Sequence, residues 1–355
     1  MPHKNEPLDQ GAMDTAHDVA VLGGGSFGTA MAKVLGENGH RVHFWMRDPN
    51  QVKEVAETRV NSRYMPGIRL EGDIRPTCDL AEAVSQAEIV FVAIPSKAFR
   101  NVIRDHSSEF RDGQIVISLT KGIEEHGFKL MSEILQEEIP RCRIGVLSGP
   151  NLAGEIVNRD LTATVIAAKD PDVRHTVQKL LGCEYFRVYA NVDIYGVELA
   201  GALKNIYAIV AGLATALDMG ENAKAMLITR GLAEMSRFAV SMGANPMTFM
   251  GLAGVGDLVV TCTSSKSRNY RVGYAVGKGK SLEDAVSELG QVAEGIYTLK
   301  LVKEKSESIG IYMPLVKGLY EILYGTASIS AVINSLMMAV QNSDVEFILP
   351  RTISQ

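Results

Sequence analysis

Residues 19–39 read VAVLGGGSFGTAMAKVLGENG, and this stretch decides the fold. The apolar run at its start predicts a buried strand, and the residues after Gly28 predict a helix. Between them stands the pattern G-x-G-x-x-G, formed by Gly23, Gly25 and Gly28. The pattern alone is weak, but a strand before it and a helix after it are the context that a dinucleotide-binding turn requires. The sequence therefore predicts a strand, a phosphate-binding turn and a helix.

Each glycine of this turn has its own expected role. Gly23 permits the tight turn, Gly25 lets a pyrophosphate approach the backbone, and Gly28 lets the helix pack against the strand. The helix N-terminus then offers unpaired amides and a positive potential to the anion. The alternative is a glycine-rich turn without a ligand, which the flanking strand and helix disfavour.

The end of the second apolar run bears on the choice of cofactor. An NAD-selective site places an acid about 20 residues after the glycines, where it binds the ribose hydroxyls. Here Arg47 comes first and Asp48 follows. Arg47 suits the 2′-phosphate of NADP, whereas Asp48 allows NAD; equally, Arg47 could stack on adenine or point into solvent. The sequence therefore predicts NADP or NAD without choosing between them.

Further apolar runs resemble the first in length and composition. They occupy residues 41–45, 89–94, 115–119, 143–147, 163–167 and 185–189. Runs this short, rich in Val and Ile and without alternation, are typical of strands covered on both faces. We therefore expect an α/β fold with an N-terminal doubly wound, Rossmann-type, mainly parallel sheet.

Helical periodicity dominates the second half of the chain. It is clearest at residues 192–217 and 221–241. Ser281 followed by Asp284 forms a variant of the capping box that opens another helix, and Gly290 would end that helix. The second half is therefore expected to be all-helical.

These patterns divide the chain near residue 190. We expect a dinucleotide-binding domain at residues 18–190 and a helical substrate domain at residues 191–340. Residues 1–17 are expected to form a flexible N-terminal segment, and residues 341–355 a C-terminal tail.

Composition narrows the class of protein. A chain of 355 residues with 46% hydrophobic residues can bury a sizeable core and favours two domains. Its formal net charge of -5 argues against nucleic acid or an anionic membrane as the main partner, because both require a basic surface. The size of the apolar helical domain suggests a homodimer.

Cysteine use and hydropathy indicate the compartment. The four cysteines are widely spaced and form no C-x-x-C pair. The N-terminal residues lack the apolar core of a signal peptide, and no apolar stretch reaches the length of about 18 residues that a membrane span needs. A cytoplasmic protein with reduced thiols, and no membrane span, is therefore expected.

Lys204 is the one cation within the apolar segment VELAGALKNIYAIVAGLATAL. A lysine there must either extend its ammonium to water or lie beside a group that stabilises its charge. Its helical neighbours Ala200, Gly201 and Ala208 are small and leave a niche that could admit a ligand, and Tyr207 lies on the same side. From helix geometry alone, a lysine that reaches the surface is the favoured interpretation.

Residues 251–273 are glycine-rich and polar. Within them, Arg268 followed by Asn269 suits a phosphate, because a planar charged fork and a neutral amide donor stand side by side. A solvated loop with incidental charge is the alternative.

Two predicted strands end in polar residues. SLTKG, with Lys121, follows one strand, and SGPN, with Gly149 and Asn151, follows another. Ligands of doubly wound sheets lie at the carboxyl ends of strands, so both segments are placed to meet one. Either could also be a simple strand-ending turn.

Together, these segments resemble the NAD(P)-dependent glycerol-3-phosphate dehydrogenase family over nearly the whole chain, from Asp18 to about Ala339. The matching motifs are GGGSFGTA at the turn, SLTKGIE at 118–124, SGPNLAGE at 148–155, ELAGALKNIYAI at 198–209, GLAGVGDLVVTCTSSKSRN at 251–269 and VAEG at 292–295. Six ordered blocks are a highly specific signal, unlike any one of them.

The resemblance implies hydride transfer between NAD(P)H and dihydroxyacetone phosphate, giving sn-glycerol 3-phosphate for phospholipid synthesis. It changes the interpretation of Lys204 to that of a general acid and base, with Lys121 and Asp257 as further catalytic residues and no metal required. The implied substrate-binding residues are Lys121, Gly149, Asn151, Lys204, Asn205, Asp257, Thr261, Ser267, Arg268 and Asn269. The implied cofactor-binding residues are Gly23, Gly25, Ser26, Phe27, Gly28, Arg47, Tyr64, Lys121, Ala153, Arg268, Val292 and Glu294.

One position departs from the bacterial pattern of this family. Bacterial-type members often carry Ser or Thr where this chain has Asn151, and eukaryotic-type members resemble it there. Two alternatives to the family remain: another two-domain dehydrogenase, of ketopantoate, 6-phosphogluconate or hydroxyacyl-CoA type, and a dinucleotide sensor without turnover. The first class lacks the GVGDLVVTCTSSKSRN block, and oxidation of NADPH by dihydroxyacetone phosphate would separate both from the main interpretation.

Overall fold

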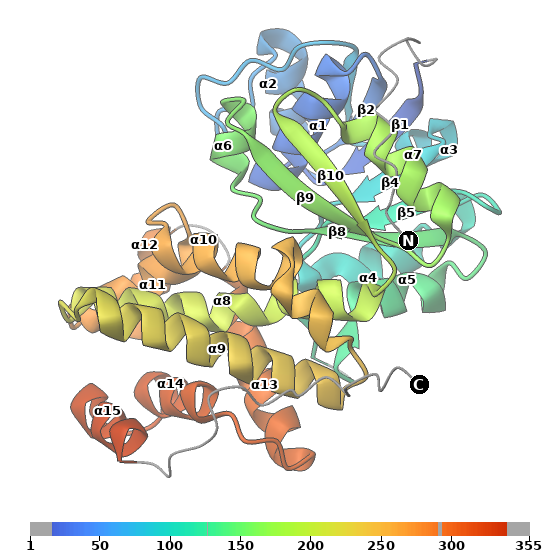
Figure 1. Cartoon of the computed structure of the whole chain (residues 1–355). Helices are drawn as coiled ribbons and strands as arrows, with labels where there is room; N and C mark the ends of the chain where they lie inside the picture. The colour runs from blue at the N-terminus through green and yellow to red at the C-terminus, as the bar shows by residue number, and fades with distance from the viewer. Residues whose placement is uncertain (1–15, 126, 290–292, 339–355) are drawn as a thin grey trace, which may run out of the picture.

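The computed structural model describes residues 16–125, 127–289 and 293–338. Figure 1 shows two parts, a sheet surrounded by helices and a bundle of helices beside it. The first part is built by the N-terminal half of the chain and the second by the C-terminal half, so the expected fold class is confirmed. Apart from residues 16 and 17, the two predicted flexible ends lie outside the described residues.

An eight-stranded sheet forms the centre of the first part. Its spatial order is β10-β9-β8-β5-β4-β1-β2-β3, and all neighbours are parallel except β8 and β9. The chain builds outward from β1 to β3 and then returns to β4 on the other side of β1, which creates a switch point between β1 and β4. The strands are β1 (Asp18–Leu22), β2 (Arg41–Trp45), β3 (Ile74–Thr77), β4 (Ile89–Val92), β5 (Ile115–Ser118), β8 (Arg143–Ser148), β9 (Thr162–Ala167) and β10 (Phe186–Asn191).

All seven apolar runs form strands, but the structure adds three that the runs do not predict. Strand β3 reads IRPT and lies at the edge of the sheet, where a proline is tolerated because one side needs no ladder hydrogen bond. The other two are β6 (Ile123–Glu124) and β7 (Lys129–Leu130), which pair as a short antiparallel hairpin.

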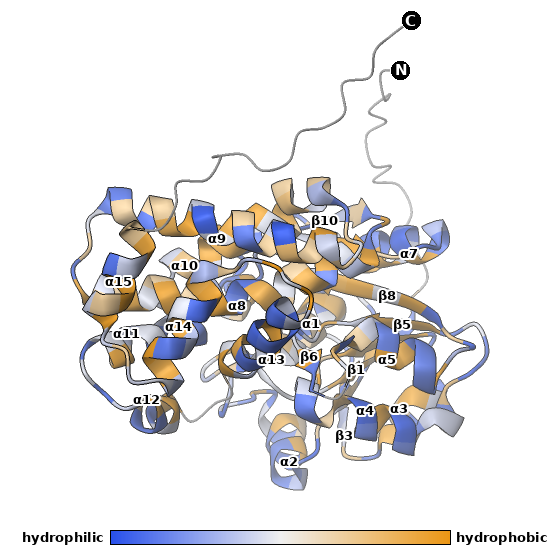
Figure 2. Ribbon diagram, turned by 90° about the horizontal axis from the view of Figure 1, so that it is seen from below, coloured by the Kyte–Doolittle hydropathy of each residue, from blue (hydrophilic) through white to orange (hydrophobic). Residues whose placement is uncertain are grey.

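Helices cover both faces of the sheet. On one face the core includes Met31 of α1 and Val173 of α7, and on the other Phe99 of α4 and Leu135 of α5. Figure 2 shows the consequence, with hydrophobic colour along β8 and hydrophilic colour on outer helices such as α2 and α7. The helices of this part are α1 (Ser26–Glu37), α2 (Pro49–Thr58), α3 (Leu80–Gln86), α4 (Ser96–Asp105), η1 (Ser107–Glu109), α5 (Met131–Glu138), α6 (Ala153–Val157) and α7 (Pro171–Leu181).

The second part is organised around helix α8 (Ile194–Ala216), which lies inside the bundle. This helix is apolar on nearly all sides, as expected of a helix surrounded by others. It is long and apolar enough to cross a membrane, but 89% of its most apolar window is buried inside the protein, which identifies it as a core helix. The other helices of this part are α9 (Glu221–Ser241), η2 (Pro246–Met250), η3 (Leu252–Gly256), α10 (Asp257–Thr263), α11 (Arg268–Gly277), α12 (Leu282–Leu289), α13 (Glu294–Ser308), α14 (Pro314–Tyr324) and α15 (Ile329–Met337).

Glycines bring α8 and α11 unusually close together. A Cβ at Gly212 of α8 would lie 2.0 Å from the carbonyl oxygen of Tyr270, and one at Gly273 of α11 would lie 1.9 Å from that of Ile209. Both distances are far below van der Waals contact, so the two backbones touch where side chains would otherwise separate them. The two helices are therefore locked against each other.

The predicted cap at Ser281 is present. The Oγ of Ser281 accepts a hydrogen bond from the backbone N–H of Asp284 at 3.0 Å, and α12 begins at the next residue, Leu282. Gly290, the predicted end of this helix, lies outside the described residues.

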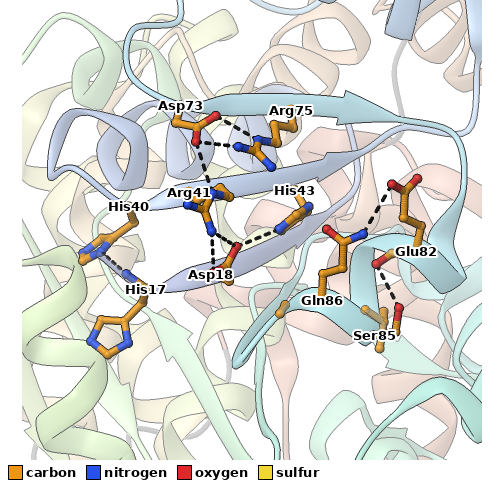
Figure 3. A network of polar contacts seen from close by, with 12 residues as sticks. His17, Asp18, His40, Arg41, His43, Asp73, Arg75, Glu82, Ser85 and Gln86 are labelled. Atoms are coloured by element: carbon orange, nitrogen blue, oxygen red, sulfur yellow. Dashed lines mark hydrogen bonds and ion pairs between the residues drawn. The ribbon is translucent and has the colours of Figure 1, made fainter. Parts of the chain in front are cut away.

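A polar network joins the first residues of the strands β1 and β2 to the residue before β3 (Figure 3). Nη1 of Arg41 donates to both oxygens of Asp18, at 2.8 and 2.9 Å, and its Nε lies 3.3 Å from Asp73. Nε2 of His43 lies 3.1 Å from the same Asp18 carboxylate. Because the network lies where the strands begin, it can tie them together without entering the carboxyl edge, where ligands bind.

Candidate active site

The glycine turn has the geometry that each of its glycines was expected to supply. Gly23 has a φ of 124°, and a Cβ there would lie 2.4 Å from the carbonyl oxygen of Ala93, just beyond β4. A Cβ at Gly28 would lie 1.9 Å from the carbonyl oxygen of Gly23. At Gly25, by contrast, a Cβ would meet nothing within 4 Å. The turn is thus packed against the sheet on one side and open above Gly25.

This opening fits a dinucleotide. Gly25 is the N-cap of α1, and no side chain caps that helix end. Its first-turn amides can therefore face a pyrophosphate in the open space. Two side chains that the sequence did not point to hold the turn in place: Gln51 and the buried Asn61 donate to the carbonyl oxygen of Gly24 at 2.6 and 2.9 Å.

Polar residues gather at the carboxyl edge of the sheet near this turn. Lys121 follows β5 and Gly149 follows β8, and the ammonium of Lys121 donates to the carbonyl oxygen of Gly149 at 3.0 Å. Only β4 separates β5 from β1, the strand that leads into the glycine turn. At about 4.8 Å between neighbouring strands, Lys121 and the turn therefore belong to strands roughly 10 Å apart, a span that a bound dinucleotide can bridge.

The Lys204 side chain is buried, with 8% of its area exposed. Its ammonium donates to Oδ1 of Asp257 and, at 2.7 Å, to Oγ1 of Thr261. The other carboxylate oxygen of Asp257 accepts from Lys121 at 2.6 Å. The prediction from helix geometry alone, that Lys204 extends to the surface, is therefore wrong. The partner of this lysine is a carboxylate from another helix, which local sequence cannot show.

Asp257 is the centre of this cluster. It is fully buried and is the first residue of α10, directly after the π-helical turn η3. Such turns are rare and occur frequently at functional sites. Asp257 connects Lys121 of the sheet part with Lys204 of the helical part, so both parts contribute to one cluster.

Burial and charge lower the pKa of Lys204 to about 7. Burial is the largest cause, because it disfavours the charged ammonium. Asp257 opposes this effect, and the nearby ammonium of Lys121 adds to it. An amine with a pKa near neutrality can both donate and accept a proton under ordinary conditions.

The predicted phosphate clamp lies on the first turn of α11. Ser267 caps this helix by accepting from the backbone N–H of Tyr270 at 3.3 Å, and Arg268 is its first residue. The buried Asn269 accepts from the N–H of Gly295 at 3.0 Å and donates to the side-chain oxygen of Asn205 at 2.9 Å. These bonds fix the orientation of the Asn269 amide at a helix N-terminus, which is a favourable position for an anion.

Arg268, Glu294 and Tyr64 lie close enough to interact electrostatically. The Arg268 side chain is exposed, and desolvation by the protein around it lowers its pKa. Glu294 accepts a hydrogen bond from Ser96 at 2.8 Å. Ser96 is the first residue of α4 and was not predicted from the sequence.

The remaining predicted residues are less closely connected. Arg47 is exposed, and Asp48 caps α2 by accepting from the N–H of Asn50 at 3.0 Å. Ala153 begins α6, and Phe27 packs partly against the core of the sheet. Val292 lies outside the described residues.

Ser148 is the last residue of β8 and the first of the SGPN segment, and it was not among the predicted site residues. Ser148 is 3% exposed, and a Cβ at Gly201 of α8 would lie 2.5 Å from its Oγ. Gly201 therefore makes room for the Ser148 hydroxyl, while the Lys121 chain lies at ordinary contact distance from the same position. Asn151 donates to Oγ1 of the buried Thr164 at 2.9 Å, which anchors this segment to β9.

A glycine turn at the switch point of a mainly parallel sheet, together with a buried lysine of the helical part that shares Asp257 with Lys121 of the sheet part, defines a dinucleotide-dependent dehydrogenase. Comparison with known families gives the particular one. The model of the NAD-dependent glycerol-3-phosphate dehydrogenase N-terminus matches residues 18–174, and that of the C-terminus matches residues 193–334. The chain belongs to this family.

Relatives agree with this assignment. Glycerol-3-phosphate dehydrogenase [NAD(P)+] of Pseudomonas syringae pv. tomato is 58% identical over 336 residues, which cover 95% of this chain and 98% of the relative. The enzyme of that name from Pseudomonas aeruginosa is 55% identical over the same length and shares of both chains. The crystal structure of glycerol-3-phosphate dehydrogenase from Coxiella burnetii is 35% identical, with a TM-score of 0.87, and the match covers 91% of this chain and 99% of that one. A ketopantoate reductase from Ralstonia eutropha shares the fold alone, at 14% identity and a TM-score of 0.57 over 86% and 96% of the two chains.

Proposed function

We propose that this protein interconverts dihydroxyacetone phosphate and sn-glycerol 3-phosphate with NAD(P)H. The observation that carries the proposal is the buried ammonium of Lys204, held by Asp257 beside Lys121 at the carboxyl edge of the sheet. Glycerol 3-phosphate and NAD(P) stand in the names of the relatives, and the six sequence motifs agree with them. Neither a ketopantoate-type dehydrogenase nor a sensor without turnover accounts for relatives with this enzyme name at 55% to 58% identity.

When bound, the nicotinamide dinucleotide supplies or accepts the hydride. In the reducing direction, negative charge develops on the substrate carbonyl oxygen, and the Lys204 ammonium stabilises it and donates the proton. In the oxidising direction, the neutral amine accepts the proton of the substrate hydroxyl. The lowered pKa of Lys204, about 7, allows both roles.

Asp257 and Thr261 orient this proton donor. The Thr261 hydroxyl donates to the backbone carbonyl of Asp257 at 2.6 Å, so its lone pairs are left for the Lys204 ammonium. The ammonium then has one hydrogen for Asp257, one for Thr261 and a third for the reacting oxygen. Lys121, bound to the same carboxylate, keeps the Lys204 pKa low by repulsion.

The substrate phosphate is proposed to lie at the N-terminus of α11. Arg268 supplies a charge and Asn269 an amide hydrogen, while Ser267 shapes this helix end. Binding energy from the phosphate, remote from the reaction, then positions the reacting carbon at Lys204.

Further parts of the proposal concern the cofactor and the domains. We assign cofactor binding to residues 18–190 and substrate binding mainly to residues 191–340. Arg47, exposed just beyond β2, is proposed to bind the 2′-phosphate of NADP, while the Asp48 carboxylate is already used as a helix cap. Steady-state kinetics with both cofactors decides between NADP and NAD.

The protein is also proposed to be a cytoplasmic homodimer that supplies glycerol 3-phosphate for phospholipid synthesis. Apolar side chains from α8, α9, α14 and α15 line a cavity of about 480 Å³ on the helical part, with Met226 and Met337 exposed beside it. Exposed apolar surface of this kind is typical of an interface. The mass of the particle in solution, measured by light scattering, tests the dimer.

The test of the reaction is to mix the protein, NADPH and dihydroxyacetone phosphate and to follow the nicotinamide absorbance. Lys204→Ala should lower kcat by at least about a hundredfold and leave cofactor affinity unchanged. Arg268→Ala should instead raise the KM for the phosphorylated substrate. Lys266→Ala is the control, because this exposed lysine pairs with Glu155 at 2.9 Å outside the cluster. Wild-type turnover in the Lys204 variant would remove it from the mechanism.

A further inference from the structure

Glu198, a carboxylate that the mechanism does not use, lies buried in α8. Its Oε1 accepts from the backbone N–H of Ser132 at 3.0 Å, and its Oε2 accepts from the hydroxyl of the same serine. A further backbone hydrogen bond comes from Met131. All of these donors belong to the first turn of α5.

These contacts cross from one domain to the other. Helix α5 packs on the sheet through Leu135, whereas α8 is the central helix of the second part. Next to α5, Ile123 and Leu130 of the short hairpin β6–β7 belong to the same hydrophobic cluster as Leu199 of α8. Glu198 therefore stands at a joint between the domains, where its charge meets the positive end of α5.

Joining two helices through a buried carboxylate costs free energy, because the carboxylate must be desolvated. Burial raises the pKa of Glu198 to about 7, and the hydrogen bonds from Ser132 and Met131 only partly offset this rise. The nearby Glu133 raises the pKa further. An apolar side chain would pack at a lower free-energy cost, but apolar contacts would not fix the orientation of one helix relative to the other. The hydrogen bonds fix both the distance and the rotation of α8 relative to α5.

Lys204 lies six residues beyond Glu198 on the same helix, a rise of about 9 Å. We propose that Glu198 is a positioning residue, which ties α8 to the first turn of α5 and thereby sets where the Lys204 ammonium stands over the nucleotide-binding domain. It touches neither substrate nor cofactor. The inference rests on the proposed role of Lys204.

Glu234 provides a matched control. It is also a buried carboxylate with a pKa raised to about 7, and it binds the N-terminus of another helix, α14, through the N–H of Leu315 at 2.7 Å. Its other oxygen accepts from the N–H of Val316, also in α14, at 3.4 Å and from the hydroxyl of Tyr207 of α8 at 3.3 Å. These contacts all lie within the helical part, so loss of Glu234 removes the same kind of bond without loosening the joint between domains.

The experiment compares Glu198→Ala, Glu198→Gln and Glu234→Ala, using wild-type turnover and Lys204→Ala as references. Glu198→Ala should lower kcat about tenfold or more while both KM values stay within about threefold, because a displacement of 1 Å at a reacting group can cost about a hundredfold. It should also increase the isotope effect with NADPH deuterated at the transferred position, since hydride transfer becomes slower. Glu198→Gln keeps an acceptor for the Ser132 N–H and should restore kcat to within about threefold of wild type.

Glu234→Ala should lower Tm by about as much as Glu198→Ala does, but its kcat should stay within about twofold of wild type. Equal kcat losses in the two alanine variants, or a Glu198→Ala variant that loses only Tm, would overturn the proposal. So would a Glu198→Gln variant that folds normally but is as slow as alanine. Should Glu198→Ala fail to fold, Ser132→Ala removes one hydrogen bond from the joint and should lower kcat about threefold; an unchanged kcat there would also overturn the proposal. Absence of turnover in the wild type would instead refute the proposed function.

Discussion

The pair of lysines on one carboxylate makes a quantitative prediction about pH. Lys121→Met removes the positive charge that faces Lys204 across Asp257. Two nitrogens on the two oxygens of one carboxylate lie roughly 5 Å apart, and with an effective dielectric constant of about 20 their repulsion is about 3 kcal/mol. That energy corresponds to about two pKa units. The pKa of Lys204, about 7 in the wild type, should therefore rise by about two units.

The assay is kcat for the reduction of dihydroxyacetone phosphate over a pH range from about 5.5 to 10. The reduction needs protonated Lys204, so wild-type kcat should be flat below its pKa and fall tenfold per unit above it. Lys121→Met should move the midpoint upward. Asp257→Asn removes the attraction that raises the Lys204 pKa, so it should move the midpoint downward.

Opposite shifts in the two variants distinguish this reasoning from general damage to the site. Lys266→Met is the control, since it removes an exposed lysine outside the cluster and should leave the midpoint unchanged. A midpoint that stays near 7 in Lys121→Met, or that moves the same way in both variants, would refute the electrostatic argument.

Three further predictions concern the turn, the sheet and the buried carboxylate. Gly28→Ala should abolish cofactor binding in a fluorescence titration, because the added Cβ would lie 1.9 Å from the Gly23 carbonyl oxygen; normal affinity would contradict this. Arg41→Ala should lower Tm at neutral pH, because it removes a hydrogen bond that stabilises the Asp18 carboxylate. Burial raises the Asp18 pKa, but the hydrogen bonds from Arg41 and His43 more than offset that rise. This stabilisation is complete above the ordinary carboxyl value of 3.8 and is lost as pH falls through the lowered pKa, so a Tm difference that persists at about pH 2 would speak against it. The free energy of unfolding of Glu198→Gln should rise by up to about 3 kcal/mol relative to wild type between about pH 5 and 8, because a carboxyl with a raised pKa lowers stability once it ionises. A difference in unfolding free energy that stays the same at all pH values, measured with denaturant, would exclude this.

Local pattern was sufficient to predict the sheet and the main helices. The seven apolar runs form strands because burial on both faces demands continuous hydrophobic sequence, and α8 and α9 fall within a few residues of their predicted ends. Strand β3 was missed because an edge strand needs neither a full apolar run nor every N–H. The antiparallel pairing of β8 and β9 was not foreseen either, since both runs read like parallel strands.

The site was harder to predict because it is assembled from distant residues. Helix geometry placed Lys204 among small neighbours but not beside Asp257, which is 53 positions away along the chain. Only the resemblance to a family predicted a catalytic role for the lysine. Ser96 and Glu198 were not predicted, because their importance comes from partners on other elements.

The close packing of α8 against α11 has a consequence for substrate choice. The proposed proton donor is on one of these helices and the phosphate anchor is at the start of the other, and the backbones meet at Gly212 and Gly273 without side chains that could adjust. The two helices therefore hold the proposed proton donor and the proposed phosphate anchor at a fixed distance from each other. On the proposed roles of Lys204 and Arg268, a phosphorylated ketone with one more carbon between carbonyl and phosphate should reach the anchor or the acid, but not both, so the proposal predicts selection by substrate length.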